Sequence, residues 1–259
     1  MDINIEEWTS VKRAGFTVHH HGAVNGVTGS CHELRLADGH SLLVDCGLFQ
    51  GEESSTDNPE IEFPIDGLIG LVVTHVHIDH VGRIPYLLAA GFRGPIFCSE
   101  ASALLLPLVL EDALKVGFTR NVSLIARFLD QIQIQVVALP YKQWRSVGDG
   151  VSIKLHPAGH ILGAAYIEVK VQAIELKAPR RRKDWRIVFS GDLGAPYTPL
   201  LPAPKPPWRA DLLVLESTYG DRLHEKRAQR QVRLRQVVEH ALRNRVTVLI
   251  PAFSIGRTQ

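Results

Sequence analysis

One short segment constrains this chain more than any other, because it places histidines and a carboxylate at the end of an apolar run. The apolar residues Leu68 to Val73 are followed at once by Thr74-His75-Val76-His77-Ile78-Asp79-His80-Val81-Gly82. Alternate residues of an extended segment project to the same side, so His75 and His77 can face one point. Asp79 and His80 can turn back toward that point where a helix begins. Four potential ligands at this density predict two adjacent metal ions better than they predict surface histidines that happen to cluster.

Two later residues extend this set of candidate ligands. His160 lies in Ala158-Gly159-His160-Ile161-Leu162-Gly163, between two predicted strands, and Asp192 ends a strand in Phe189-Ser190-Gly191-Asp192. Taken alone, His160 is typical of an ordinary loop histidine, and Asp192 of a turn-forming aspartate. Their combination with the first cluster makes both of them candidate ligands. The run His19-His20-His21 is a weaker candidate, because strand alternation sends its members to both faces, and a non-catalytic role is favoured.

Composition bounds the class of protein without choosing a function. The chain has 259 residues, 45% hydrophobic and 22% charged, which is typical of a globular protein with a packed core. Its acidic N-terminus does not resemble a secretory signal. The longest apolar stretch, 101–110, contains Pro107 and is too short to cross a bilayer, so no membrane span is expected. Three widely spaced cysteines argue against a disulfide framework and favour a reducing cytoplasm.

The order of the predicted elements indicates an α/β fold in layers. Buried strands are predicted at 41–44, 68–73, 134–138, 151–156, 164–174 and 185–190. Helices are predicted at 80–91, 99–116 and 119–132. Strands that alternate with helices and then recur in a second strand-rich stretch predict a sandwich of sheets with helices outside.

The last sixty residues have a different character. Six prolines between 196 and 208 exclude helix and favour an extended surface strap over a flexible linker. A strand is predicted at 211–215, a helix at 225–245 and a further strand at 246–250. The helix has one apolar face, which must pack, formed by Leu234, Val237, Val238, Ala241 and Leu242. A sequence that stops soon after a fresh strand is expected to be interrupted.

The metal-ligand motifs resemble those of the metallo-β-lactamase superfamily. Its H-x-H-x-D-H motif, later histidine and later aspartate match residues 75–80, His160 and Asp192. The resemblance implies an αββα sandwich with one zinc on His75, His77 and His160. It implies a second zinc on Asp79 and His80, with Asp192 bridging both. Asp45, in Leu43-Val44-Asp45-Cys46-Gly47, matches the family's first motif, whose aspartate orients the ligands from behind. The alternative is a turn aspartate that closes a strand.

Further motifs resemble the β-CASP branch of that superfamily, which contains RNA-processing nucleases such as the pre-mRNA cleavage endonuclease subunit and ribonuclease J. They lie at 22–31, 43–51, 216–222 and 251–259. The resemblance implies a metallo-β-lactamase domain over 1–215 and the start of an inserted β-CASP domain over 216–259, with the remainder absent. Glu216 matches the acidic motif thought to orient a general-acid histidine, although its position alone is equally typical of a surface carboxylate.

That histidine, and another that completes the second zinc site, belong in the family to a later segment that this sequence does not contain. We therefore expect a truncated chain that binds fewer than two tight equivalents of zinc and cleaves RNA poorly.

The resemblance implies a zinc-dependent hydrolase, most specifically a ribonuclease in which Asp79, Asp192 and Glu216 are catalytic. A water bridging two zinc ions loses a proton near neutral pH and can attack a phosphodiester. The alternatives are a thioesterase or lactonase of the same fold, and a non-catalytic RNA-binding subunit. RNA is the expected partner, with a homodimer as a further option. The net charge of +2 is too small to imply, by itself, a polyanionic binding partner. The basic cluster at 180–183 could contact phosphates, although a solvated hairpin tip is the commoner explanation.

Overall fold

The computed structural model describes residues 10–13, 15–51, 59–117, 119–172, 184–198, 200–223, 228–252 and 255. The chain divides into two compact units, Met1–Glu216 and Ser217–Gln259. The basic cluster at 180–183 lies outside the described residues. The assignment of the second unit as the start of a β-CASP insertion stays a prediction.

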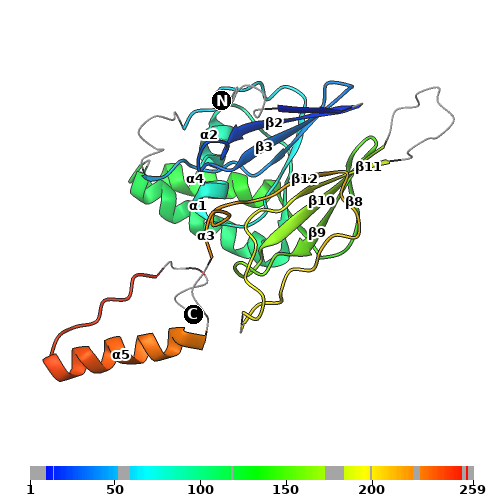
Figure 1. Cartoon of the computed structure of the whole chain (residues 1–259). Helices are drawn as coiled ribbons and strands as arrows, with labels where there is room; N and C mark the ends of the chain where they lie inside the picture. Colours follow the sequence, from blue (N-terminus) through cyan, green and yellow to red (C-terminus); the bar gives the residue numbers. More distant parts are fainter. Residues whose placement is uncertain are drawn as a thin grey trace. The chain divides into compact units, whose positions relative to one another are not determined.

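Two β-sheets form the centre of the first unit (Figure 1). Among the described residues, the first sheet has seven strands in sequence order: β1 (Ser10–Arg13), β2 (Phe16–Gly22), β3 (Cys31–Leu36), β4 (Ser41–Val44), β5 (Leu68–Val72), β6 (Ile96–Ser99) and β7 (Val136–Leu139). The second has five strands in the order β12-β11-β10-β9-β8: β8 (Arg145–Gly148), β9 (Val151–Pro157), β10 (Ala165–Gln172), β11 (Asp184–Phe189) and β12 (Leu212–Val214).

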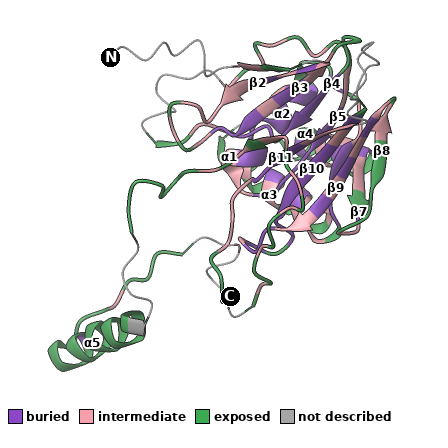
Figure 2. Ribbon diagram, turned by 45° about the vertical axis from the view of Figure 1, so that its right-hand side comes forward, coloured by how far each residue is buried: buried purple, intermediate pink, exposed green. Residues whose placement is uncertain are grey.

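The main hydrophobic core lies between these sheets. Leu42, Val44 and Phe97 from the first sheet pack in one buried cluster with Ile153 and Ile167 from the second. The residue between the first two, Leu43, is also fully buried but lies outside this cluster, because alternate residues of a strand point to opposite faces. Strand β4 is therefore covered on both faces, and Figure 2 shows buried residues through the centre of both sheets.

Helices cover the other face of the seven-stranded sheet. They are α1 (Ile78–Val81), α2 (Ile84–Ala89), α3 (Glu100–Gly117) and α4 (Val122–Gln135), grouped together in Figure 1. Helix α3 contacts β6, β7 and α4, and its buried leucines Leu106, Leu110 and Leu114 form one stripe at four-residue spacing. None of the described helices combines the length and apolar character that crossing a bilayer requires. The predicted mixed α/β sandwich is confirmed.

The predicted helix over 80–91 is wrong as a single element. Helix α1 ends at Val81, and α2 begins at Ile84 with Pro85 in its first turn. The Arg83 amide between them donates to the carbonyl of Cys46 at 2.9 Å. A tertiary hydrogen bond thus replaces a helical one, and the proline then starts a new helix.

Two more boundaries differ from prediction. Helix α4 starts at Val122, where the Asn121 side chain accepts a hydrogen bond from the Leu124 amide at 3.2 Å, and β7 starts two residues later than expected. The strand predicted at 246–250 is wrong, because these residues form no strand and pair with none in the described chain. An apolar run becomes a strand only when a neighbour satisfies its backbone groups.

The second unit contains helix α5 (Ala228–Asn244), which confirms the predicted helix within three residues at its start. Its predicted apolar face is not buried within the described chain. Ala241 is buried beneath the turn in which the Val246 amide donates to the Ala241 carbonyl, but Leu234 and Leu242 remain exposed.

Candidate metal centre

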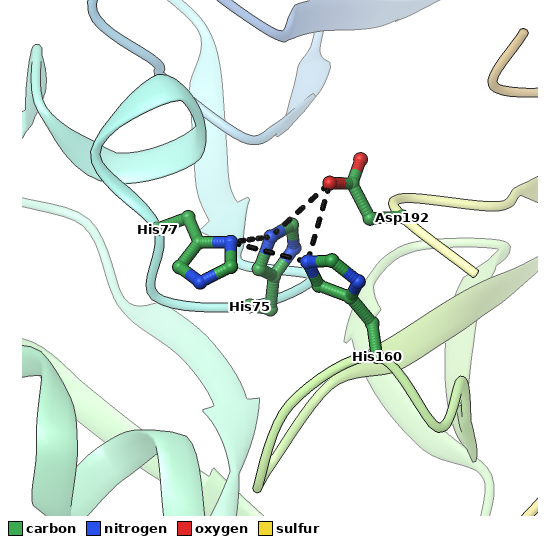
Figure 3. A group of neighbouring side chains, drawn as sticks. All are labelled: His75, His77, His160 and Asp192. Atoms are coloured by element: carbon green, nitrogen blue, oxygen red, sulfur yellow. Dashed lines mark hydrogen bonds and ion pairs between the residues drawn. The ribbon is translucent and has the colours of Figure 1, made fainter. Parts of the chain in front are cut away.

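Four candidate ligands from three loops meet at one point (Figure 3). His75 and His77 follow β5, His160 follows β9 and Asp192 follows β11. His77 Nδ1 lies 3.1 Å from the Nε2 atoms of both His75 and His160. Asp192 Oδ2 lies 3.7 Å from His75 Nε2 and 3.4 Å from His160 Nε2. One ligating atom from each of the four lies within 4.8 Å of every other.

A second group adjoins the first and shares a residue with it. His80 Nε2 lies 3.7 Å from Asp79 Oδ2 and 3.2 Å from Asp192 Oδ1. Asp192 therefore presents one carboxylate oxygen to each group. The structure brings together all six candidate ligands predicted from the sequence.

Glycines allow the ligand loops to approach this closely. Gly191, at φ 50°, lies against Thr74, and a Cβ added there would come within 2.7 Å of the Thr74 Cβ. Gly194 donates its amide to the Ala158 carbonyl at 2.8 Å, and a Cβ on it would lie 1.8 Å from the carbonyl oxygen of Gly159. The loops that carry His160 and Asp192 thus touch backbone to backbone, which only residues without a Cβ permit.

Asp45 lies directly behind the site. Its backbone adopts φ 60°, a left-handed conformation that is uncommon for residues other than glycine, asparagine and aspartate. Its Oδ1 accepts the Thr74 amide at 2.8 Å, and its Oδ2 accepts the Thr74 hydroxyl at 2.8 Å and lies 2.7 Å from His80 Nδ1. Asp45 therefore lies where the ligand-orienting role predicted for it can be performed.

These contacts determine which ring nitrogen carries the proton on two histidines. An ionised carboxylate only accepts hydrogen bonds, so His80 donates from Nδ1 to Asp45, and its Nε2 is the nitrogen that faces the Asp79 and Asp192 carboxylates. The Thr74 hydroxyl proton is used on Asp45, so Thr74 Oγ1 accepts from His75 Nδ1, 3.2 Å away. His75 Nε2 is then free of a proton.

Sequence reasoning gave Thr74 no role. The only signal for it was its position immediately before His75.

The electrostatics of the first group suit a cation. Burial, reinforced by the neighbouring imidazoles, holds the pKa of His75 well below its ordinary value, and burial also lowers the pKa of His160. Burial opposes charge on His80 too, but the Asp45 and Asp192 carboxylates raise its pKa well above the ordinary value. Unprotonated imidazole nitrogens that converge beside one carboxylate are the donor set of a divalent transition metal, so the residues fit the expected group.

Comparison with known proteins decides the family. The family model described as the metallo-beta-lactamase superfamily matches residues 24–164, more than half of the chain. This chain belongs to the metallo-β-lactamase superfamily. That assignment agrees with the sandwich of sheets and implies metal binding, for which the grouped histidines and aspartates could supply the ligands.

Several curated relatives of this metallo-β-lactamase chain are named as ribonucleases. Ribonuclease TTHA0252 of Thermus thermophilus is 36% identical over 92% of this chain and 52% of its own length. Endoribonuclease ysh1 of Schizosaccharomyces pombe is 29% identical over 92% of this chain and 30% of its own, and Integrator complex subunit 11 of Gallus gallus is 28% identical over 92% and 40%. The resemblance to the β-CASP nucleases is confirmed. The chain spans about half the length of the first of these relatives, and less of the others.

Glu216 contacts the site of this metallo-β-lactamase chain indirectly. Its Oε1 accepts the Leu193 amide at 2.7 Å, and its own amide donates to Ser190 Oγ at 2.9 Å. Glu216 therefore supports the loop that carries Asp192. Its predicted role toward a general-acid histidine stays a prediction.

The three consecutive histidines of β2 alternate as predicted. His19 and His21 stack on one face with ring centroids 6.4 Å apart, and His20 turns to the other face, where its Nδ1 lies 2.9 Å from His32 Nδ1.

Proposed function

We propose that this chain carries the two-zinc site of a ribonuclease that hydrolyses RNA phosphodiester bonds. The observation that carries the proposal is the position of Asp192, whose two oxygens each face one group of ligands. One carboxylate between two donor sets suits two adjacent cations, the arrangement used by many enzymes that cleave phosphate esters. The choice of RNA as substrate is supported by the names of the relatives.

The residues of the site have distinct parts in this proposal. Zinc ions held there would activate water and stabilise the charge that builds on the attacked phosphate. His75, His77 and His160 hold one position as neutral donors. Asp79 and His80 hold the other, and Asp192 supplies negative charge to both. Thr74 keeps the ligating nitrogen of His75 free of a proton, and Asp45 directs the Nε2 of His80 toward the site.

The two positions differ in the number of donors that the described residues supply. The first group contains four candidate ligands, and the second contains three, of which Asp192 is shared. We expect one tight and one weaker equivalent of zinc, because affinity rises with the number of placed ligands. Titration of the metal-free chain against a chromophoric chelator measures both constants.

A cleavage assay tests the function itself. The purified chain is incubated with single-stranded and structured RNA, with and without EDTA, beside thioester and lactone substrates. Low but zinc-dependent RNA cleavage that is absent from a His75→Ala variant supports the proposal. Turnover of the thioester or lactone with RNA left intact overturns it. RNA binding without any zinc-dependent cleavage also overturns it, in favour of a non-catalytic RNA-binding subunit.

Two finer features belong to the same proposal. Action in a reducing cytoplasm is supported by Cys31, Cys46 and Cys98, which are all free and buried. Association as a homodimer is tested by light scattering of the purified chain.

A further inference from the structure

A line of hydrogen bonds continues from Asp45 away from the metal centre. Ser30, just before β3, places its Oγ 3.3 Å from Asp45 Oδ2. His32 in β3 has Nε2 3.5 Å from that Oγ, and His20, its partner across the β2–β3 pair, has Nδ1 2.9 Å from His32 Nδ1. The line thus runs from the outer pair of histidines through Ser30 and Asp45 to His80. The ligand motifs use none of its first three members.

The accepting end of the line determines the direction of every bond in it. Asp45 can only accept, so the Ser30 hydroxyl proton points at Asp45. The Ser30 oxygen then accepts from His32 Nε2, which therefore carries the proton of a neutral ring. His32 Nδ1 is left as an acceptor, and His20 Nδ1 donates to it. Each residue has one arrangement compatible with the next.

The surroundings of His32 agree with a neutral, fixed ring. Burial, together with the nearby His20, lowers the pKa of His32 to about 3. Its ring lies nearly parallel to that of Phe189, with centroids 6.0 Å apart and planes at 18°. Phe189 is the last residue of β11, which leads to Asp192, so the ring is held between the strand that carries it and the approach to the metal centre.

We propose that Ser30 and His32 are positioning residues for the second metal position, acting on His80 through Asp45. This inference rests on the proposed function, because it requires that Asp79, His80 and Asp192 hold a metal ion. Asp45 Oδ2 accepts from Thr74, His80 and Ser30, so the Ser30 bond adds to the restraint on that oxygen. Loss of this restraint lets the carboxylate turn, and the His80 ring turns with it. The first position depends on this restraint less directly, because Asp45 reaches His75 through Thr74.

Zinc titration of variants tests the inference. Ser30→Ala and His32→Leu break the line, whereas His32→Gln keeps a donor close to the place of Nε2. We expect the first two to weaken the second zinc equivalent about two- to tenfold, the effect of one modest hydrogen bond, and to weaken the first equivalent less. His32→Gln restores most of the loss. His19→Gln, on the neighbouring strand β2 and on the face opposite His20, is the matched control and changes neither constant.

The ratio of the two constants separates positioning from a general structural effect, because both positions share one fold. Cobalt substitution provides a second readout, since the visible bands of the second cobalt ion shift only if its ligands turn. Equal weakening of both equivalents in Ser30→Ala, or an unchanged ratio with unchanged bands, overturns the inference. A wild-type chain that binds a single equivalent overturns it while leaving the first position intact. A wild-type chain that binds no zinc overturns the proposed function itself.

Discussion

At the scale of single residues, the site depends on side chains that do not face the metals. Asp45 accepts hydrogen bonds from Thr74 and His80 while it is itself held at a positive φ. The parallel pairing of β4 with β5 and the bond from the Asp45 amide to the Val72 carbonyl hold this conformation. The orientation of His80 is thus determined one contact away from the metal.

Asp45→Asn tests this dependence. The amide keeps the size of the side chain but offers His80 a neutral, weaker acceptor or a competing donor. We expect the affinity for the second zinc to fall about 10- to 100-fold, as for other partners of metal-ligating histidines. Asp38→Asn, at an exposed carboxylate in the β3–β4 turn, is the control and leaves zinc affinity unchanged. Equal affinities in Asp45→Asn and wild type would refute the role.

Glu33 gives a prediction about pH. Burial alone would raise its pKa, but His21, Ser41 and Arg35 together lower it to about 2. A carboxylate whose pKa is depressed by folding stabilises the fold above its unfolded pKa, near 4.5, and this stability is lost as the pH falls toward 2. The contribution is on the order of 3 kcal/mol, at about 1.4 kcal/mol for each pKa unit.

Urea unfolding at pH 7, 4 and 3 measures this contribution of Glu33 to the unfolding free energy. The difference in unfolding free energy between wild type and Glu33→Gln should shrink with acidity. Glu111→Gln, at an exposed pair with Lys115, should show no such trend. A difference that is constant with pH contradicts the assignment.

The sequence predicted the ligands better than it predicted their supports. The ligands in the segment His75 to His80 can be recognised from the sequence, because a metal requires particular ligand atoms and few residue types supply them. Thr74 and Ser30 contact Asp45 from positions 29 and 15 residues away along the chain. No local pattern encodes such contacts, so only the fold reveals them.

At the scale of elements, the loop after β4 packs closely against α1, and this contact positions the second group of candidate ligands. Gly47 lies so close to α1 that a Cβ on it would fall 1.6 Å from the Asp79 carbonyl oxygen. The Cys46 amide also donates to the His80 carbonyl at 2.8 Å. These backbone contacts explain why a single helix over 80–91 does not form, because the turn between α1 and α2 is bound to a different segment. Hydrophobic periodicity, on which that prediction rested, contains no information about such a partner.

Gly47→Ala should therefore be among the most damaging small substitutions in the chain. The added methyl group must displace α1, so we expect a loss of more than about 2 kcal/mol in unfolding free energy, and with it Asp79 and His80 leave their positions. Gly117→Ala, where a Cβ meets nothing within 4 Å, is the matched control and should stabilise helix α3 by up to about 1 kcal/mol. Chemical denaturation of both variants provides the comparison. Similar unfolding free energies for the two variants would contradict the close contact between Gly47 and α1.

At the scale of the whole molecule, the layered class could be predicted because alternating buried strands and amphipathic helices leave few architectures open. The structure of the last forty residues was predicted less accurately. A strand at 246–250 was expected from its apolar residues, but pairing is a property of two segments, and the described chain offers this one no neighbour. Helix α5 could be predicted because its apolar repeat lies within one continuous segment and needs no second segment to be recognised.

Metal binding should be visible in the stability of the whole chain. Six candidate ligands from separate loops are brought together only in the folded state, so zinc held by them would bind that state selectively. At about 100 times the dissociation constant this adds about 2.7 kcal/mol, which raises the melting temperature by roughly 5 to 10 °C for a domain of this size. Differential scanning calorimetry with zinc and with EDTA measures the shift. His160→Ala should lose most of it, whereas His156→Ala, whose ring contacts Glu168, should keep it. A shift that survives His160→Ala would locate the bound zinc elsewhere.

In the proposed two-metal site, the shared carboxylate of Asp192 would link the two positions in a thermodynamic cycle. Its Oδ1 lies 3.2 Å from His80 Nε2 and its Oδ2 lies 3.4 Å from His160 Nε2, so an ion held at one oxygen would restrict how the carboxylate presents the other. Whatever factor the first ion applies to the affinity for the second, the second returns to the first. Binding at each position would therefore be coupled to binding at the other through a single side chain.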